Sequence, residues 1–436
     1  MEVLVVSKVD NEQHATFTLQ NPPAVELPSS SIRVRTLLVG LTSNNLTYAG
    51  AGHYLHWWDT YPVPTTSPTP YNDISSWGIV PAWGHAVVLE STITSILQGT
   101  VLWGFWPTST VPTDLKLQEA EPKGHWIEIS DHRQELMNLY NRYIEVPKSS
   151  VSLPSPGFGT VELEDMAWNA LFRGLWEAAY LLSQHVFSPS PETQSPIHPL
   201  GVAMPWTAAD ADLSSATVVS LSASGKTARS FAYHLSNRPA SAGPLGLLQV
   251  TSSPVPISEA AEKLQPPYPT RTIAYSEIGE SSEWIASLKA SKIVIVDFGA
   301  RSNTLNQLVE SIKNHPKLES STLVIMQVGS QQKVVRDEDV LASREEMSRL
   351  GKVQYNTSGV KDTVMQLNGA GAYFDTFNPL WDQWLRNRRR SIPDMRIVWG
   401  KGISGADGLE GGWQRLCQGL VDGEEDCSEV EAVLKG

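Results

Sequence analysis

Short apolar runs alternate with amphipathic stretches between residues 216 and 328, and this alternation is the clearest pattern in the chain. Apolar runs that suit buried strands occur at 216–221, 245–251, 272–275, 292–298 and 322–328. Between them, apolar residues at helical spacing predict helices at 226–237, 257–264, 283–290 and 302–314. Strands that alternate with helices in this way form a parallel sheet covered on both faces. The pattern therefore predicts a doubly wound α/β domain.

The residues before this region have a different pattern. Alternating or apolar runs at 32–39, 86–89 and 100–103 predict strands that are separated by turns rich in glycine and proline. Residues 60–72 contain four prolines and are expected to form a surface loop. A long amphipathic stretch at 161–186 predicts a helix that opens the α/β region. After it, 371–377 is interpreted as a strand and 378–390 as a helix.

A chain of 436 residues is too long for a single hydrophobic core. The pattern divides it into a β-rich domain, 1–160 plus 365–436, and an inserted α/β domain, 161–364. The net charge of −13 leaves no basic surface for a phosphate backbone, so nucleic acid is not an expected partner. The basic run 386–390 is interpreted as a solvated helix end.

Neither a membrane nor secretion is indicated by the sequence. No run approaches the ~20 apolar residues of a membrane span, and the first residues lack the basic segment of a secretory signal. The two cysteines, Cys417 and Cys427, are too few for a disulfide framework. We therefore expect a cytoplasmic protein, with a homodimer as one option for its assembly.

Tryptophan is unusually frequent, with 15 residues in the chain. Four of the tryptophans in the β-rich part are candidates for the wall of a substrate pocket: Trp57, Trp58, Trp83 and Trp106. Such a cluster suits a hydrophobic small molecule. Packing in the core explains the same cluster equally well.

The turn after the first strand of the α/β region is a candidate phosphate site. Its small and polar residues are Ser222, Ser224, Gly225, Lys226 and Thr227. A helix that begins here directs backbone N–H groups and its positive dipole end toward an anion. The turn satisfies neither the Walker A motif nor the G-x-G-x-x-G fingerprint. The alternative is that these small residues only close a tight turn.

The end of the second strand carries Thr251 and Ser252, and the residues around them include neither an acid nor an arginine. In dinucleotide-binding domains, an acidic residue here binds the ribose 2′-hydroxyl and an arginine accepts a 2′-phosphate. This part of the sequence therefore offers hydroxyl groups alone for a nucleotide ribose.

Four segments occur in an order that resembles a known family: 44–49 (NNLTYA), 77–84 (WGIVPAWG), 104–107 (GFWP) and 222–228 (SASGKTA). Between about residues 30 and 390 the chain is similar to an uncharacterised family of medium-chain-reductase-like proteins from fungi and bacteria, described as a domain of unknown function. The resemblance implies a GroES-like β domain with an inserted Rossmann-type domain, NADP bound at the Rossmann domain, and substrate in the cleft between them. Pro254 and Val255 depart from the family pattern, which has an arginine near this place.

The resemblance also bears on metal binding and on catalysis. Zinc-dependent members of the wider superfamily use a cysteine and a Gly-His-Glu turn, but here Gly84-His85 is kept while Thr42-Ser43 replaces the cysteine. No metal is therefore expected. Tyr48 is the first candidate for a catalytic residue, with Asn44 and Asn45 to orient a carbonyl group. His53, His56 and His85 are candidates for acid–base chemistry.

Three classes of function remain open at this point. The first is a zinc-independent, NADP(H)-dependent reductase that acts on an enone or carbonyl of a hydrophobic metabolite, as a tailoring enzyme of secondary metabolism. The second is a cyclase or isomerase that has kept the cleft and lost the cofactor. The third is a silent ligand-binding protein.

Overall fold

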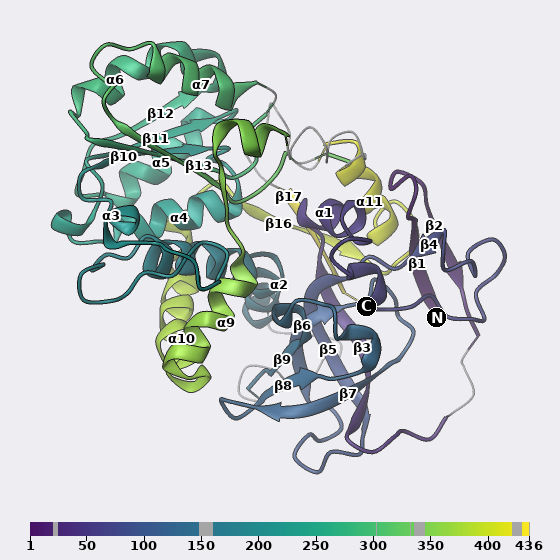
Figure 1. Cartoon of the computed structure of the whole chain (residues 1–436). Helices are drawn as coiled ribbons and strands as arrows, with labels where there is room; N and C mark the ends of the chain where they lie inside the picture. Colours follow the sequence, from purple (N-terminus) through teal and green to yellow (C-terminus); the bar gives the residue numbers. More distant parts are fainter. Residues whose placement is uncertain are drawn as a thin grey trace.

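The computed structural model describes residues 1–20, 25–147, 160–301, 303–331, 333–334, 345–420 and 430–435. Figure 1 shows an α/β body, in teal and green, beside a β-rich body formed by the purple and blue N-terminal part of the chain. Helix α2 (Thr160–Leu181) lies between the two bodies. In the described part of the chain, no helix is both long and apolar enough to cross a membrane.

The α/β body contains a six-stranded sheet in which all neighbours are parallel. Across the sheet the strands are β12 (Thr270–Ala274), β11 (Gly246–Thr251), β10 (Ala216–Leu221), β13 (Lys292–Asp297), β14 (Thr322–Gln327) and β15 (Val353–Gln354). The order reverses direction between β10 and β13. In open parallel sheets, ligands bind beyond the carboxyl ends of the strands at such a reversal.

Each face of this sheet has its own hydrophobic core, because neighbouring side chains of a strand point to opposite faces. Val218 of β10 belongs to the core that contains residues of α2, α4 (Lys226–Ser236) and α10 (Ala370–Asn387). Val219 belongs to the core formed with α6 (Ser281–Ser287) and α7 (Thr304–Lys313). The predicted doubly wound sheet is confirmed.

The β-rich body contains a sheet that closes on itself. Around the ring run β3 (Ser31–Gly40), β5 (Ala82–Ser91), β6 (Val101–Trp106), β9 (Arg142–Glu145), β8 (His125–Glu128) and β7 (Thr113–Ala120). An additional pairing of β3 with β7 closes the ring into a barrel. Together with the parallel sheet, this gives the GroES-like plus Rossmann architecture of the medium-chain reductases, which the family resemblance implied.

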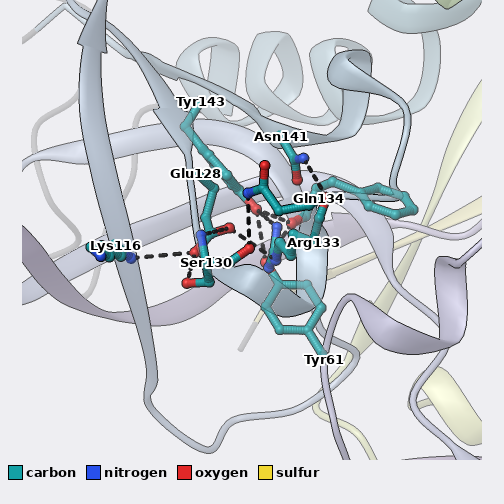
Figure 2. A network of polar contacts seen from close by, with 9 residues as sticks. Tyr61, Lys116, Glu128, Ser130, Arg133, Gln134, Asn141 and Tyr143 are labelled. Atoms are coloured by element: carbon teal, nitrogen blue, oxygen red, sulfur yellow. Dashed lines mark hydrogen bonds and ion pairs between the residues drawn. The ribbon is translucent and has the colours of Figure 1, made fainter.

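The β-rich body also buries a polar network centred on Arg133 (Figure 2). The Arg133 side chain is 1% exposed, lies 3.6 Å from the Glu128 carboxylate and donates a hydrogen bond of 2.8 Å to the Tyr143 hydroxyl. Its guanidinium is 4.5 Å from the centre of the Tyr61 ring. Burial alone lowers the pKa of Arg133, but Tyr143, Tyr61 and Glu128 outweigh it and raise this pKa above its usual value. The buried arginine therefore stays charged.

Segments from the two ends of the chain meet beside the barrel. The small sheet of β2 (His14–Thr18), β1 (Glu2–Ser7) and β4 (Trp77–Gly78) contacts helix α11 (Leu409–Cys417), which lies near the C-terminus. The buried Trp413 indole of α11 donates a hydrogen bond of 3.0 Å to the Asn11 carbonyl. Strands β16 (Arg396–Lys401) and β17 (Val430–Lys435) extend the barrel sheet beyond β3.

One element differs from the sequence interpretation. Residues 371–377 do not form a strand, because α10 is a continuous helix from Ala370 to Asn387. Its buried side chains, Tyr373, Phe374, Phe377, Trp381 and Trp384, recur every three or four residues and pack in the core beside the parallel sheet. Helix α9 (Thr357–Asn368) packs against α10. The division of the chain at residue 365 stays a prediction.

Candidate active site

A cavity of about 570 Å³ lies between the two bodies, at the carboxyl edge of the parallel sheet. From the β-rich body, its wall includes Asn44, Thr47 and Tyr48 of α1 (Asn44–Gly50), together with Trp57 and Tyr140. The α/β body contributes residues that follow its strands, which are Gly225 to Ala228, Phe298, Gln327 to Ser330 and Gln354 to Ser358. We call this cavity the interdomain cleft.

The interdomain cleft continues into a smaller inner pocket of about 100 Å³. Asn44, Tyr48 and Tyr140 line both spaces, so these residues stand where the cleft and the inner pocket meet. The remaining wall of the inner pocket is mainly apolar and includes Trp83 and Leu171. A flat apolar group that entered the inner pocket would therefore contact Tyr48.

The predicted phosphate turn opens onto the interdomain cleft. Gly225 is the N-cap of α4 and provides no side-chain cap, and the residues that begin the helix, Gly225 to Ala228, line the interdomain cleft. The backbone of Gly225 has φ −63° and ψ 148°, which any residue adopts, and an added Cβ would meet only the Ser222 carbonyl oxygen at 3.4 Å. Neither the backbone conformation nor a contact within the described chain therefore requires glycine here. A phosphate bound close to this backbone would require it, because a side chain would occupy the same space.

The other residues predicted for the cofactor surround this turn without lining the interdomain cleft. Ser222 has φ 60° and its side chain is hydrogen-bonded with Tyr275, and the Ser224 carbonyl accepts a hydrogen bond of 3.1 Å from Arg229. Thr251 is fully buried, and its hydroxyl oxygen accepts a hydrogen bond of 3.1 Å from the Ser253 N–H. Ser252 is half-buried at the end of β11.

Sequence reasoning missed an arginine near this turn. Arg301 follows β13, and its guanidinium lies 5.9 Å from the centre of the Tyr275 ring. Tyr275 is hydrogen-bonded with Ser222, which belongs to the phosphate turn. The phenol of Tyr275 and the positive charge of Arg301 therefore both lie beside this turn. No local sequence signal connects them, since Tyr275 follows β12 while Arg301 follows β13.

Tyr48 is buried, with 6% of its surface exposed, and it stands among aromatic side chains. Its hydroxyl oxygen accepts a hydrogen bond of 3.2 Å from the Trp83 indole N–H, and it is also bonded with Tyr140 and Asn44. Burial raises the pKa of Tyr48 above its usual value, and these hydrogen bonds offset part of the rise. The phenol therefore keeps its proton at neutral pH and can donate it.

The two asparagines are placed differently. Asn44 lines both the interdomain cleft and the inner pocket. Asn45 is 1% exposed; its side-chain oxygen accepts a hydrogen bond from the Thr42 N–H at 2.7 Å, and its amide donates to the Pro81 carbonyl at 2.9 Å. Asn45 therefore fixes the start of α1, and Asn44 is the asparagine that is available to a substrate.

His85 is not brought together with Tyr48. It lies on β5 two residues after Trp83, but it faces a second cavity on the other side of α2. Burial and the charge of Arg173 lower the pKa of His85 to about 3, so the imidazole is neutral. His53 and His56 stand in the loop after α1, where the His56 ring lies 2.9 Å from Asp59. Among the described residues, no three His, Cys, Asp or Glu side chains converge as metal ligands would.

Two of the four predicted tryptophans reach the candidate site. Trp57 lines the interdomain cleft and Trp83 the inner pocket. Trp58 packs beneath Gly52 and Gly78, with Lys8 over its ring at 5.5 Å. Trp106 is fully buried and donates a hydrogen bond of 3.1 Å to the Gly84 carbonyl. The structure thus places Trp58 and Trp106 in the core of the β-rich body and not in the pocket.

Solved structures with the same fold include two that are named as reductases and one that is described in complex with NADPH. They include a mitochondrial 2-enoyl thioester reductase heterodimer from Candida tropicalis (TM-score 0.52, 10% identity) and CurA in complex with NADPH from Vibrio vulnificus (TM-score 0.51, 10% identity). A third is a putative NADPH:quinone reductase from Bacillus thuringiensis (TM-score 0.50, 12% identity). Each comparison covers 100% of this chain and 98% or 99% of the other.

At this level of identity the likeness concerns the fold alone. None of the curated proteins matches the chain in sequence. A family model described as "Protein of unknown function (DUF2855)" matches residues 39–422, which span the barrel, the parallel sheet and the interdomain cleft. The chain therefore belongs to the DUF2855 family.

Proposed function

We propose that this protein is an NADP(H)-dependent reductase that acts on an enone or carbonyl group of a hydrophobic metabolite in the interdomain cleft. One observation carries the proposal: the open N-terminus of α4 and the Tyr48 hydroxyl line the same cavity. The first is suited to a phosphate and the second to a substrate oxygen. The fold relatives support this assignment, since CurA is described in complex with NADPH.

The residues of the phosphate turn fit a dinucleotide. The N–H groups at the start of α4 would bind the pyrophosphate, and Gly225 would let it approach the backbone. Lys226 and Thr227 line the interdomain cleft beside them. When bound, the cofactor would supply the hydride for the reduction.

The choice of NADP(H) over NAD(H) rests on charge. The segment after β11 contains no acidic residue to bind a ribose 2′-hydroxyl. Arg301 and Tyr275 stand instead beside Ser222 and would favour the negative charge of a 2′-phosphate. Binding of NADPH is therefore expected to be tighter than that of NADH.

Tyr48 would act on the substrate as a donor. Its neutral hydroxyl would bind the substrate oxygen and then transfer a proton as negative charge develops during reduction. The Trp83 N–H would stabilise the phenolate oxygen that remains. Trp57, Met137 and Leu175 on the wall of the interdomain cleft suit a hydrophobic substrate body.

A second candidate is a cyclase or isomerase that works without a cofactor. The observation in its favour is at the end of β11, where Thr251 is fully buried and the segment after it has no arginine. In that case Tyr48 and Asn44 would act on a substrate that fills the interdomain cleft alone. Nucleotide binding distinguishes the two candidates.

Titration of the purified protein with NADPH and NADH, followed by quenching of tryptophan fluorescence, tests the reductase proposal. We expect saturable binding of NADPH in the micromolar range, weaker binding of NADH, and a loss of affinity in Lys226→Ala. If neither nucleotide binds, the reductase proposal is wrong and the cofactor-free candidate takes its place.

Gly225→Val tests whether the phosphate lies against the turn. The added side chain would occupy the space in front of the α4 amides, so we expect the Kd for NADPH to rise at least about tenfold. The free energy of unfolding should fall by no more than about 1 kcal/mol, since the backbone angles of Gly225 suit any residue. Gly279→Val is the matched control, because Gly279 is exposed with no atom within 4 Å of an added Cβ. An unchanged Kd in Gly225→Val would place the nucleotide elsewhere.

A further inference from the structure

A second cavity, of about 610 Å³, lies on the other side of α2 from the interdomain cleft. It is enclosed by α2, by α10 and by the β5, β6, β8 and β9 side of the barrel. Helix α2 is the wall shared by the two spaces: Asn169 and Arg173 face the second cavity, whereas Leu175 and Ala178 face the interdomain cleft. The function proposed above uses nothing in this second cavity.

The most conspicuous group in the second cavity is the Arg173 guanidinium. It lies 5.5 Å from the centre of the Trp103 ring, 5.2 Å from that of Phe377 and 5.9 Å from that of Trp381. The guanidinium donates a hydrogen bond of 2.6 Å to the side-chain oxygen of Asn378, which is neutral. Among the described residues, no carboxylate forms an ion pair with Arg173, and Glu177 on the same helix is paired with Lys361 at 2.8 Å instead.

His85, on the wall of the same cavity, has a ring nitrogen that forms no hydrogen bond. His85 is 2% exposed and lines the cavity, and its ring nitrogen Nδ1 is buried with no hydrogen-bond partner. Burial and Arg173 hold the pKa of His85 at about 3. His125, on the same wall, also has its pKa lowered to about 3, by burial and by Arg142, Lys361 and Arg173. Both imidazoles are therefore neutral, and the charge of Arg173 acts on each of them.

Arg173 has no carboxylate within ion-pair distance among the described residues. Its side chain is half-buried, and a cation that loses part of its hydration gains from an anion or several hydrogen bonds. The aromatic rings around Arg173 compensate in part, through cation–π contacts. The planar guanidinium keeps donors that are suited to two parallel hydrogen bonds with one carboxylate. Glu177 and Asp382 act on Arg173 only from beyond ion-pair distance, so a carboxylate from outside the chain would fit these donors.

The shape and charge of the walls narrow the class of this anion. The half-buried apolar side chains of Ile144 and Val146 on the wall suit a hydrophobic body beside the carboxylate. Apart from Arg173, the lining carries three carboxylates (Glu145, Asp165 and Asp382) and two cations (Lys123 and Arg386), so it does not favour a ligand with several negative charges. We propose that the second cavity is a binding site for a small organic monocarboxylate with a hydrophobic body, held by Arg173.

trans-Cinnamate and its neutral amide, trans-cinnamamide, are the probes that test this proposal. We expect isothermal titration calorimetry to show saturable 1:1 binding of cinnamate to the wild-type protein and at least about tenfold weaker binding of cinnamamide, because the amide lacks the charge that pairs with Arg173. This comparison uses only wild-type protein. Absence of cinnamate binding, or equal affinity for the two probes, would overturn the proposal.

A matched pair of variants locates the site. Arg173→Lys keeps the charge but loses the planar pair of donors, so the Kd for cinnamate should rise about tenfold or more. Arg35→Lys, at an exposed position of β3, should leave the Kd unchanged. An equal Kd for wild type and Arg173→Lys would contradict the assignment.

The same titration at saturating NADPH separates the second cavity from the interdomain cleft. Cinnamate should bind with NADPH present, since the two sites lie on opposite sides of α2. Displacement of cinnamate by NADPH would mean that the probe occupies the interdomain cleft, and the proposal would then fail. Because cinnamate binding needs no nucleotide, the result does not depend on whether the reductase proposal is correct.

Discussion

Tyr48→Phe should lower kcat/KM about 10²-fold or more in an assay of NADPH oxidation with hydrophobic enones. The substitution removes the hydroxyl that would bind the substrate oxygen and transfer a proton. A loss of this size is typical when a general acid is removed. The ring itself remains, so its edge-on contacts with Trp57 and Phe105 should persist. The Kd for NADPH should therefore stay at the wild-type value.

The matched control is Tyr54→Phe, since Tyr54 is 60% exposed in the loop after α1. It should leave both turnover and nucleotide affinity unchanged. Wild-type turnover in Tyr48→Phe would exclude Tyr48 as the donor. The acid would then have to be another residue of the cleft or an ordered water.

Arg133→Met is expected to destabilise the protein by about 3–5 kcal/mol, because it leaves the buried Glu128 carboxylate without its cation. The variant also removes the donor to the Tyr143 hydroxyl that Figure 2 shows at the centre of the network. Urea unfolding followed by tryptophan fluorescence measures the effect. The exposed residue Arg35, changed to Met, should alter stability by no more than about 0.5 kcal/mol.

A double variant separates the charge from the packing. If an uncompensated charge on Glu128 causes the loss, Arg133→Met combined with Glu128→Gln should be more stable than Arg133→Met alone. A double variant that is less stable than the single one would show that Glu128 is held mainly by its hydrogen bonds from the N–H and hydroxyl of Ser130.

The parallel sheet could be predicted because its strands are buried on both faces. Their apolar runs are continuous and the helices between them are amphipathic, so each element carries its own signal, as in Val218 and Val219. In contrast, the interpretation of 371–377 as a strand was wrong. Over so short a segment, the positions of Tyr373, Phe374 and Phe377 are compatible with the periodicity of a strand and with that of a helix. The recurrence at Trp381 and Trp384 identifies the helix.

The candidate site could be predicted only where it follows the order of the chain. The phosphate turn follows β10 directly, and Gly225 was found there. Trp83 and His85 are both on β5, yet α2 crosses this strand and places them in different cavities. The packing of α2 between two residues on the same face of β5 is a feature of the tertiary structure. No local sequence pattern predicts it.

The hydrogen bond from Trp413 to Asn11 joins residues that are 402 positions apart. At roughly 5–20 residues per second, a ribosome needs about 20–80 s to make the intervening chain. The N-terminal strands remain without α11 for that time. In contrast, all strands of the parallel sheet are synthesised before α11, so each can pair with its neighbours sooner. The inserted domain can therefore mature first during translation, and the β-rich domain that begins the chain is completed last.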